Sequence, residues 1–446
     1  MKYKTQSLVS IIGLAVGFTC FALSVLWIRY EMTYDNFHKG ANRIYLVRAH
    51  YTNQPGISNS TPYPLMEYLQ EKMPEIEDMT TLSARYVKFR MGDNEQEVGM
   101  VAADSTFMTF FDIQLLKGTV NFLKSGSPEV AITEEFAQRL FGKEEDALGK
   151  EVEIGRRSCK IGAIVSGWSH HSNISYSVLT SARHYFSWGS SDEQLFIRVR
   201  EKVDMNVFQT KMSAIRINEI DKESELSDLF ITRISALRYS DYVNKADVVI
   251  SFSYIFYFSL AGGLVIICSL FNYLTLYVSR LCMRSREMAL RKVNGASNKV
   301  LSMQFAIELL LILCIALLGG LLLIEISMSQ FIEFTQIESD SYYGEMAVYL
   351  LVVIMLSFLF AQIPLLYFRR RTLQETINGN TVTTRPYLFR KIGIVVQLIV
   401  SLTFIFCTFV IMKQLYFLKN TDLGMERHNV ATVSYTQSDA ADDRIS

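Results

Sequence analysis

The sequence lacks the motifs by which most enzymes and disulfide-rich domains are recognised. It contains no C-x-x-C pair, and the spacing of its six cysteines suggests no disulfide framework. It also contains no G-x-S-x-G, no H-E-x-x-H and no catalytic cysteine signature, and the stretch "GKEEDALGK" lacks the spacing of a P-loop. We therefore expect no catalytic residue, no metal site, no cofactor and no ATP bound through a Walker A motif.

A net charge is also missing. The chain has 44 Lys and Arg against 44 Asp and Glu, so the protein as a whole is not attracted to nucleic acid, and we expect no nucleic-acid partner. The neutral total hides a segregation, because apolar residues, bases and acids lie in separate blocks. At 446 residues the chain can form two or three domains.

Five apolar runs approach or exceed the roughly 20 residues that cross a bilayer as a helix. They lie at about 8–28, 252–278, 301–326, 347–368 and 392–412. The first run continues into "LWIRYE" without a small-residue cleavage site, which favours a retained helix over a signal peptide. The sequence thus predicts a multi-pass protein of the lipid bilayer.

The short loops between these runs predict the orientation. Residues 279–300 carry six bases against Glu287, residues 369–391 carry six against Glu375, and the loop between the third and fourth runs has acids but no Lys or Arg. Short loops rich in Lys and Arg stay in the cytoplasm. With Lys2 and Lys4, this rule places the N-terminus inside and the large segment after the first run outside.

The same pattern divides the chain into six parts. We expect an N-terminal transmembrane helix, an α+β domain outside the membrane, a permease region with three transmembrane helices, a cytoplasmic linker, a fifth transmembrane helix, and the incomplete start of a second outside domain. Their predicted bounds are 1–30, 31–248, 249–370, 371–391, 392–412 and 413–446. The fold class is therefore a membrane protein of mixed type, with a bundle of about five helices and an α+β domain.

The expected outside domain interleaves strands and helices without long βαβ repeats. "SPEVAITEEFAQRLFG" predicts a strand followed by a helix, with Thr133 as N-cap and Gly142 as C-terminal stop. "NRIYLVRAHY" and "EQLFIRVRE" predict strands, and "KEVEIGRRSCKIGAIVSG" predicts a hairpin. The "SHHS" stretch at 169–172 has no spaced ligand partner, so we interpret its histidines as solvent-exposed loop residues and not as a metal site.

A short basic segment, "RSREMALRKVNGASNKV" at 284–300, lies between two apolar runs. Its strong helix formers and the Glu287–Arg291 pair, four residues apart, predict a helix. Asn294-Gly295 ends this helix, and Ser297 can cap the next one. Two interpretations remain open: the bases contact anionic headgroups, which composition alone favours, or a cytoplasmic partner docks on the helix.

Among the polar side chains within the predicted membrane spans, we single out Asn272, Glu308 and Gln397. Polar groups are costly in lipid and usually face other protein segments, so we expect them at interhelical contacts. For Glu308 a base at the cytoplasmic edge is a candidate partner. The pairs Gly262-Gly263 and Gly319-Gly320 allow either bending or close packing, and the sequence does not decide between them.

The residues around this basic segment resemble a known family. "SRLCMRSREMALRKVNGASNKVLSMQFAIELLLILCIALLGG" is similar to the signature of FtsX-like, MacB-type ABC transporter permeases. "YEMTYDNFHKGANRIYLVR", "VAADSTFMTFFDIQLLKG" and "AITEEFAQRLFGKEEDALGK" resemble the MacB-type periplasmic core domain, in the form found in duplicated permeases of Bacteroidetes-like bacteria. The resemblance covers nearly the whole chain.

The resemblance implies a mechanism in which a separate cytoplasmic ABC ATPase dimer docks on the basic segment, so that this chain is not itself an enzyme. The helices that flank the outside domain then carry the motion outward. It also implies the bacterial inner membrane, a cytoplasmic N-terminus, and efflux, export of lipoproteins or peptides, or control of the cell envelope as the task. The coupling residues would be Arg286, Glu287, Leu290, Arg291 and Lys292 at the contact and Gly295 and Ser297 at the hinge.

Residues 388–435 repeat the plan of the first helix and resemble the opening of a second permease half. We therefore expect a fragment of a duplicated, truncated permease, or a chain that pairs with a second permease half or with a periplasmic or outer-membrane partner. The alternative function is a membrane-bound extracytoplasmic sensor or receptor, because a helix, a domain and a second helix also describe many sensors. The three further spans and the lack of a signalling module favour the permease.

Overall fold

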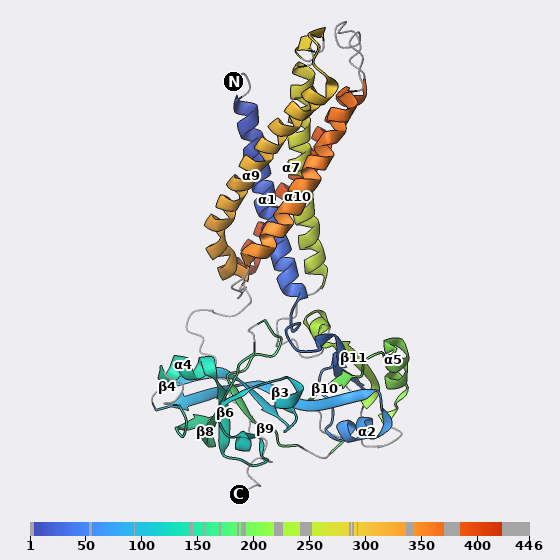
Figure 1. The fold of residues 1–446 in the computed structure, drawn as a ribbon. Helices are drawn as coiled ribbons and strands as arrows, with labels where there is room; N and C mark the ends of the chain where they lie inside the picture. Colours follow the sequence, from blue (N-terminus) through green and yellow to red (C-terminus); the bar gives the residue numbers. More distant parts are fainter. Residues whose placement is uncertain are drawn as a thin grey trace. The chain divides into compact units, whose positions relative to one another are not determined.

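The computed structural model describes most of the chain (Figure 1), namely residues 4–52, 56–92, 94–142, 147–155, 157–168, 171–184, 187–188, 193–217, 226–240, 252–284, 287, 290–291, 293–335, 342–369 and 384–421. Internal contacts divide it into two units. The first comprises Met1–Ile266 and Ile307–Phe360, and the second comprises Ile267–Ala306 and Ala361–Ser446.

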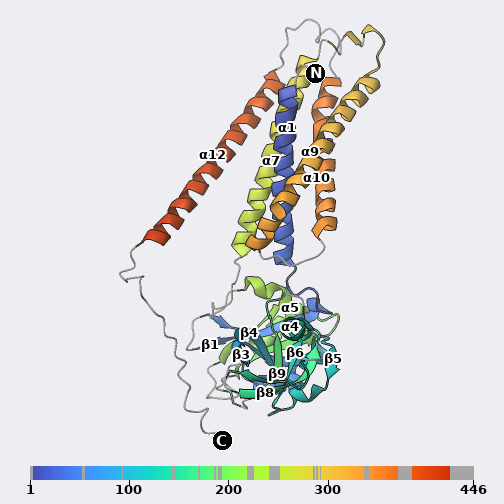
Figure 2. The ribbon, with the colours of Figure 1, turned by 90° about the vertical axis from the view of Figure 1, so that its left-hand side faces the viewer.

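Five long helices contain the apolar runs, namely α1 (Lys4–Met32), α7 (Phe252–Met283), α9 (Asn298–Thr335), α10 (Tyr342–Arg369) and α12 (Thr384–Asn420) (Figure 2). Among the described residues, four stretches are long and apolar enough to cross a membrane: Ser7–Met32, Phe252–Leu281, Lys299–Glu333 and Lys391–Asn420. The predicted run at 347–368 is helical throughout, but its apolar stretch, Met346–Leu359, is shorter. Helix α12 extends beyond its predicted bounds of 392–412 at both ends.

In the first unit, small residues let the membrane helices approach closely. A Cβ on Gly262 of α7 would lie 2.8 Å from the Ser24 side chain of α1, and one on Gly320 of α9 would lie 3.3 Å from the Ala15 carbonyl oxygen. The Thr19 hydroxyl donates a hydrogen bond to the Gly320 carbonyl over 3.1 Å. Both glycines therefore serve close helix packing, the second of the two alternatives that the sequence left open.

The domain that follows α1 in the chain is built on one mixed sheet (Figure 1). Its described strands run in the order β11-β1-β10-β3-β4-β9-β6-β8-β5, with β2 paired to β1 and β7 paired to both β3 and β8. Pairs β4–β9 and β6–β8 are parallel, and the other pairs are antiparallel. The strands are β1 (Ile44–Tyr51), β2 (Ile57–Ser58), β3 (Ile76–Met91), β4 (Asn94–Ala103), β5 (Leu115–Gly118), β6 (Glu129–Thr133), β7 (Glu151–Ile154), β8 (Arg157–Val165), β9 (Val178–Ser181), β10 (Gln194–Val199) and β11 (Leu226–Arg233).

Short helices cover this sheet, and its buried residues form three hydrophobic clusters. They are α2 (Pro64–Lys72), α3 (Phe107–Phe110), α4 (Glu134–Phe141) and α5 (Met205–Ala214), with 3-10 turns η1 (Ala41–Arg43), η2 (Val120–Leu123) and η4 (Ile234–Tyr239). On one face, α2 and α5 pack on the β1, β10 and β11 end and α4 packs on the β6 to β8 end. A third cluster, rich in Phe, lies on the opposite face, because its strand residues alternate with those of the other two clusters. The mixed α and β prediction is confirmed.

Local signals account for α4. The Thr133 hydroxyl accepts a hydrogen bond from the Phe136 amide, which satisfies one of the free N–H groups of the first turn. Gly142 follows the helix with φ of 72°, a left-handed conformation that glycine adopts without a steric cost. Both predictions for this helix are therefore confirmed.

Candidate functional site

The basic segment that the sequence singled out lies in the second unit. Of its predicted coupling residues, Arg286 and Lys292 lie outside the described residues, whereas Glu287, Leu290, Arg291, Gly295 and Ser297 are described. Residues 287, 290, 291 and 293 are helical. The predicted helix is thus present where the structure describes the segment.

Ion pairs lie within this segment, and a hydrogen bond and a cation–π contact join it to the start of α9. Glu287 accepts hydrogen bonds from Arg291 over 2.6 Å and from Arg284 over 3.3 Å. The hydrogen bond from Arg284, together with the charge of Arg291, holds the pKa of the Glu287 carboxyl below its ordinary value. Arg291 also donates to the Gln304 side chain over 2.8 Å, and the Arg284 guanidinium lies 5.0 Å from the centre of the Phe305 ring. The segment and α9 are therefore bound to each other by side chains.

The end of the predicted helix and the cap of the next helix match the prediction. Gly295 has φ of 90°, and the Ala296 amide donates back to the Arg291 carbonyl, so the helix ends here. Ser297 caps α9 by accepting from the Val300 amide over 3.3 Å. Leu290 is 66% exposed and Val293, three residues later, is similarly exposed, so the segment presents an apolar edge between its charges.

The three predicted intramembrane polar residues lie on three different helices: Asn272 on α7, Glu308 on α9 and Gln397 on α12. Each is half-buried, and the expectation that they face protein stays a prediction. Within the second unit α12 approaches α7, since a Cβ on Gly393 would lie 3.6 Å from Phe271 and 3.7 Å from Thr275. The pairing of Glu308 with a cytoplasmic base stays a prediction.

A second site, which the sequence did not reveal, lies in the first unit where α1 ends. Glu31, one residue before the end of α1, is only 2% exposed, and its carboxylate accepts hydrogen bonds from Arg238 of η4, the shorter over 2.9 Å. The Tyr239 hydroxyl donates to the Glu31 carbonyl. The Arg238 guanidinium also lies 3.9 Å from the centre of the Tyr34 ring. Together with residues described in the next two paragraphs, these side chains form a site that we call the junction. Its members are Tyr30, Glu31, Tyr34, Asp35, His38, His171, Ser172, Asn173, Arg238 and Tyr239.

Asp35 forms the other half of the junction. Its buried carboxylate accepts hydrogen bonds from the Ser172 hydroxyl, from the Asn173 side chain over 2.6 Å and from the Asn173 amide over 3.2 Å. Burial raises the pKa of Asp35 to about 6, although the hydrogen bonds from Ser172 and Asn173 oppose this shift. The turn after α1 is therefore tied to the loop at 171–174.

Two histidines complete the junction. His171 stacks on Tyr30 with ring centres 4.0 Å apart and hydrogen-bonds the Tyr30 carbonyl over 2.5 Å. Burial lowers the pKa of His171, and it lowers that of His38, 3.8 Å from Asp35, to about 4. The interpretation of the "SHHS" stretch as a solvent-exposed loop is therefore wrong for His171, because aromatic residues from the end of α1 cover its ring; His170 lies outside the described residues.

Comparison with known proteins gives the following similarities. Residues 7–215 match the MacB-like periplasmic core domain family, and residues 258–373 match the FtsX-like permease C-terminal family. A comparison with curated proteins found no match. Among solved structures, the chain is similar to a domain of a protein described as a permease from Porphyromonas gingivalis, with 20% identity, TM-score 0.38, and coverage of 44% of this chain and 91% of that one.

Two further solved structures are similar over the same part of the chain. The periplasmic region of MacB from Actinobacillus actinomycetemcomitans is 13% identical with TM-score 0.33, covering 44% of this chain and 92% of that one. The extracellular domain of the ABC-type transporter YknZ from Gram-positive bacteria is 15% identical with TM-score 0.32, covering 42% of this chain and 99% of that one.

Proposed function

Because this chain belongs to the MacB/FtsX-type family of ABC transporter permeases, we propose that it transmits movement from a separate cytoplasmic ATPase to its domain outside the membrane. The task served by this movement is efflux, export of lipoproteins or peptides, or mechanical control of the cell envelope. The protein would lie in the inner membrane of a bacterium with its N-terminus in the cytoplasm.

One observation carries this proposal, namely the ion pair between the buried Glu31 at the end of α1 and the half-buried Arg238 of η4. Breaking a buried pair by removing one partner typically costs about 3–5 kcal/mol, because the remaining charge stays buried without compensation. A displacement of the end of α1 that left the domain behind would incur a cost of this kind. The domain is therefore expected to move with the helix.

Helix α1 is suited to carry such a displacement. It is unbroken over 29 residues, which at 1.5 Å per residue is about 43 Å, long enough to cross a bilayer. Its buried residues recur at helical spacing along one stripe, at Leu14, Phe18, Ala22 and Leu26. A helix packed along its length and clamped at its outer end moves as a rigid body.

The input to this movement is the basic segment. Glu287, Leu290 and Arg291, with Arg286 and Lys292, form the proposed contact with the ATPase, and Gly295 and Ser297 form the hinge before α9. The exposed Leu290 and Val293 support this role, because solvated apolar side chains between charges are typical of a docking edge. The hydrogen bond between Arg291 and Gln304 would transmit a displacement of the basic segment to α9.

We propose the domain limits that the sequence predicts and assign each domain a role in this movement. Residues 31–248 form the driven domain, and 249–370 form the permease region with its three helices. Residues 371–391 link this region to the helix predicted at 392–412, and 413–446 begin a second outside domain. The structure of α12 supports a helix in the fifth position, extending from Thr384 to Asn420.

Recovery of the ATPase tests the proposal. The full chain serves as bait in a mild detergent extract of its native cells, and the test variant carries Glu287→Arg with Leu290→Asp. A matched control carries the same two changes on exposed residues of the outside domain, Glu97→Arg on β4 with Leu116→Asp on β5.

We expect an ABC ATPase with the wild type and with the control, and its loss with the test variant. Equal recovery in all three would show that the ATPase does not dock on this segment. Failure to recover any ATPase would favour the alternatives, in which the bases bind lipid headgroups and the chain serves as a receptor.

A further inference from the structure

The first two turns of α7 carry a group of exposed aromatic residues. The members of this group, each at least 58% exposed, are Phe252, Tyr254, Phe256 and Tyr257. Because successive residues of a helix are rotated by about 100°, these rings point to several sides of α7. Aromatic side chains gather where a membrane meets water, since the ring contacts acyl chains and headgroups together. The group, which we call the aromatic collar, therefore marks the level of the headgroup layer.

Contacts within the first unit place the junction at the level of this collar. The ring of Tyr239, whose hydroxyl donates to the Glu31 carbonyl, lies 6.1 Å from the ring of Phe252. One turn deeper, the ring of Trp27 on α1 lies 4.7 Å from that of Phe258 on α7. From Trp27 to Glu31 the helix rises about 6 Å, and the headgroup layer is roughly 5–8 Å thick. The end of α1 therefore lies within this layer.

The chain stays close to the end of α1 over the next residues, 32–40. The Thr33 amide donates to the Tyr30 carbonyl, and the Asn36 amide donates to the Thr33 carbonyl. Each hydrogen-bonded turn keeps its two ends within about 7 Å. Residues 32–40, which we call the membrane-side turn, therefore follow the headgroup layer closely.

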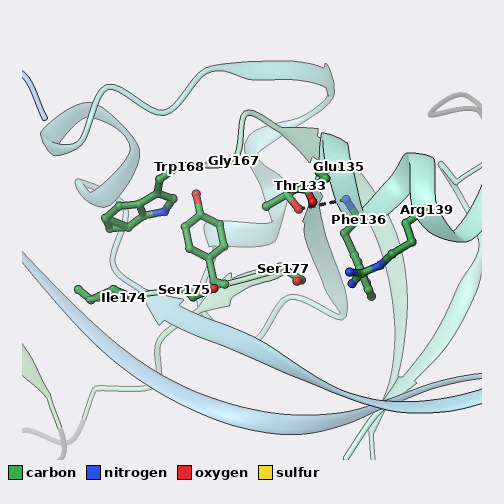
Figure 3. Close-up of a pocket in the computed structure, with 10 residues that line it drawn as sticks. Thr133, Glu135, Phe136, Arg139, Gly167, Trp168, Ile174, Ser175 and Ser177 are labelled. Carbon is green, nitrogen blue, oxygen red and sulfur yellow. Dashed lines mark hydrogen bonds between the residues drawn. The ribbon is translucent and has the colours of Figure 1, made fainter. Parts of the chain in front are cut away.

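The inner side of the membrane-side turn is held by the Phe-rich cluster of the outside domain. The His38 ring lies 5.0 Å from the ring of Phe111 and 4.8 Å from that of Trp168. Trp168 lies 5.3 Å from the ring of Tyr176 and lines a small cavity beside α4 (Figure 3). Phe37, next to His38, remains 45% exposed. The turn is thus anchored on its inner side and presents Phe37 on its outer side.

The exposed part of the turn combines apolar side chains with a base. Of residues 32–40, all of which the structure describes, the exposed ones are Met32, Asn36, Phe37 and Lys39, whereas the acid of the turn, Asp35, is buried. Such a surface fits a headgroup layer, where apolar side chains insert and an ammonium group pairs with phosphate. A protein partner is a poorer fit, because lysine is depleted in protein–protein interfaces.

We propose that the membrane-side turn rests on the lipid headgroups of the leaflet that faces the outside domain. Met32 and Phe37 insert between the headgroups, and Lys39 pairs with lipid phosphate. The bilayer thereby supports the turn that joins α1 to the domain, beside Asp35 and His38 of the junction. The inference rests on the membrane spans and not on the ATPase, so its failure would leave the proposed transmission of movement untouched.

Photocrosslinking tests this contact in the full chain. Phe37→p-benzoylphenylalanine keeps an aromatic ring at the exposed position, and the protein is placed in nanodiscs of phosphatidylethanolamine and phosphatidylglycerol. After illumination, mass spectrometry identifies the molecule attached at position 37. The same analogue replaces Tyr86 of β3, which is 67% exposed in the outside domain, as the control for water. It replaces Ile315 of α9, which is 50% exposed within a membrane span, as the control for lipid.

We expect lipid adducts at positions 37 and 315, about tenfold more abundant than at position 86. Adding Lys39→Glu should lower the adduct at position 37 about fivefold, because attraction to phosphate becomes repulsion. Lys124→Glu, at an exposed position elsewhere in the outside domain, should leave it unchanged. Because Phe37 is exposed, the labelled protein should unfold at the temperature of the parent, so a missing adduct is not a folding defect.

Three results would overturn the proposal. A yield of lipid adduct at position 37 no higher than at position 86 would show that Phe37 lies in water. An adduct that joins two protein chains instead of a lipid would assign this surface to a second copy of the chain. A lipid adduct that Lys39→Glu leaves intact would exclude the contact between Lys39 and phosphate.

Discussion

Asp35 and His38 at the junction make opposite contributions to stability as the pH changes. Burial raises the pKa of Asp35 from 3.8 to about 6, and it lowers the pKa of His38 from 6.5 to about 4. Below pH 6 the folded protein protonates Asp35 before the unfolded chain does, which stabilises the fold progressively down to about pH 4. Below pH 6.5 the unfolded chain protonates its histidine while the buried His38 stays neutral, which destabilises the fold over nearly the same range.

The two contributions are close in size. Each pKa shift is roughly 2 units, and at 1.36 kcal/mol per unit each contributes about 3 kcal/mol over this range. Their sum in the wild type is therefore close to zero between pH 6.5 and 4. The nearby Arg238 and His171 belong to the same environment and are retained in every variant, so differences between variants isolate the two groups.

Two single substitutions separate the contributions. Asp35→Asn removes the acid and suits the positive φ of 57° at this position, because asparagine tolerates the left-handed region. His38→Phe keeps a ring among Phe37, Phe111 and Trp168. Relative to the wild type, the Asp35→Asn protein should lose about 3 kcal/mol of unfolding free energy from pH 6.5 to 4, and the His38→Phe protein should gain about as much.

The assay is urea unfolding of the full chain in nanodiscs, followed by tryptophan emission at a series of pH values. Only the change of stability with pH matters, so a constant offset caused by repacking does not affect the conclusion. The assignment of opposite contributions to Asp35 and His38 is wrong if the unfolding free energies of both variants change with pH in the same direction. It is also wrong if neither variant differs from the wild type in this pH dependence.

Two further predictions concern stability. Arg238→Met leaves the Glu31 carboxylate buried without a partner and should destabilise the outside domain by about 3–5 kcal/mol, whereas adding Glu31→Met should recover part of the loss; urea unfolding of both variants checks this. Gly118→Ala would place a Cβ 2.1 Å from the Gly162 carbonyl oxygen, so it should lower the melting temperature far more than Gly126→Ala, which also has positive φ but open space around it. Similar losses for the two alanine variants would contradict the close approach at Gly118.

Much of the fold was predictable because its signals are local. The strand at Ile44–Tyr51 follows from its β-branched and aromatic residues, and α4 follows from Thr133, its acidic first turn and Gly142. The end of the basic segment at Gly295 and the cap at Ser297 were predictable for the same reason. In each case residues within one or two turns determine the backbone, so a single sequence suffices.

The junction was not predictable, because its parts lie far apart in the chain. Glu31 and Arg238 are separated by 207 residues, and the order of the strands between them cannot be read from any local pattern. His171 was misplaced since its neighbours in the sequence are polar, whereas its stacking partner is Tyr30. One signal was available in "YEMTYDNFH", where three ionisable residues other than tyrosine directly follow an apolar span of bilayer length.

Nucleotide-dependent hydrogen exchange tests the central claim most directly. The chain is reconstituted with its co-purified ATPase, and exchange of the amides at 171–174 and 234–239 is compared with and without ATP, in the wild type and in Arg238→Met. Transmission through the junction predicts a change on adding ATP in the wild type and its loss in the variant, with ATP hydrolysis continuing in both. An equal ATP-dependent change in the variant, or none in a wild-type complex that hydrolyses ATP, would contradict it.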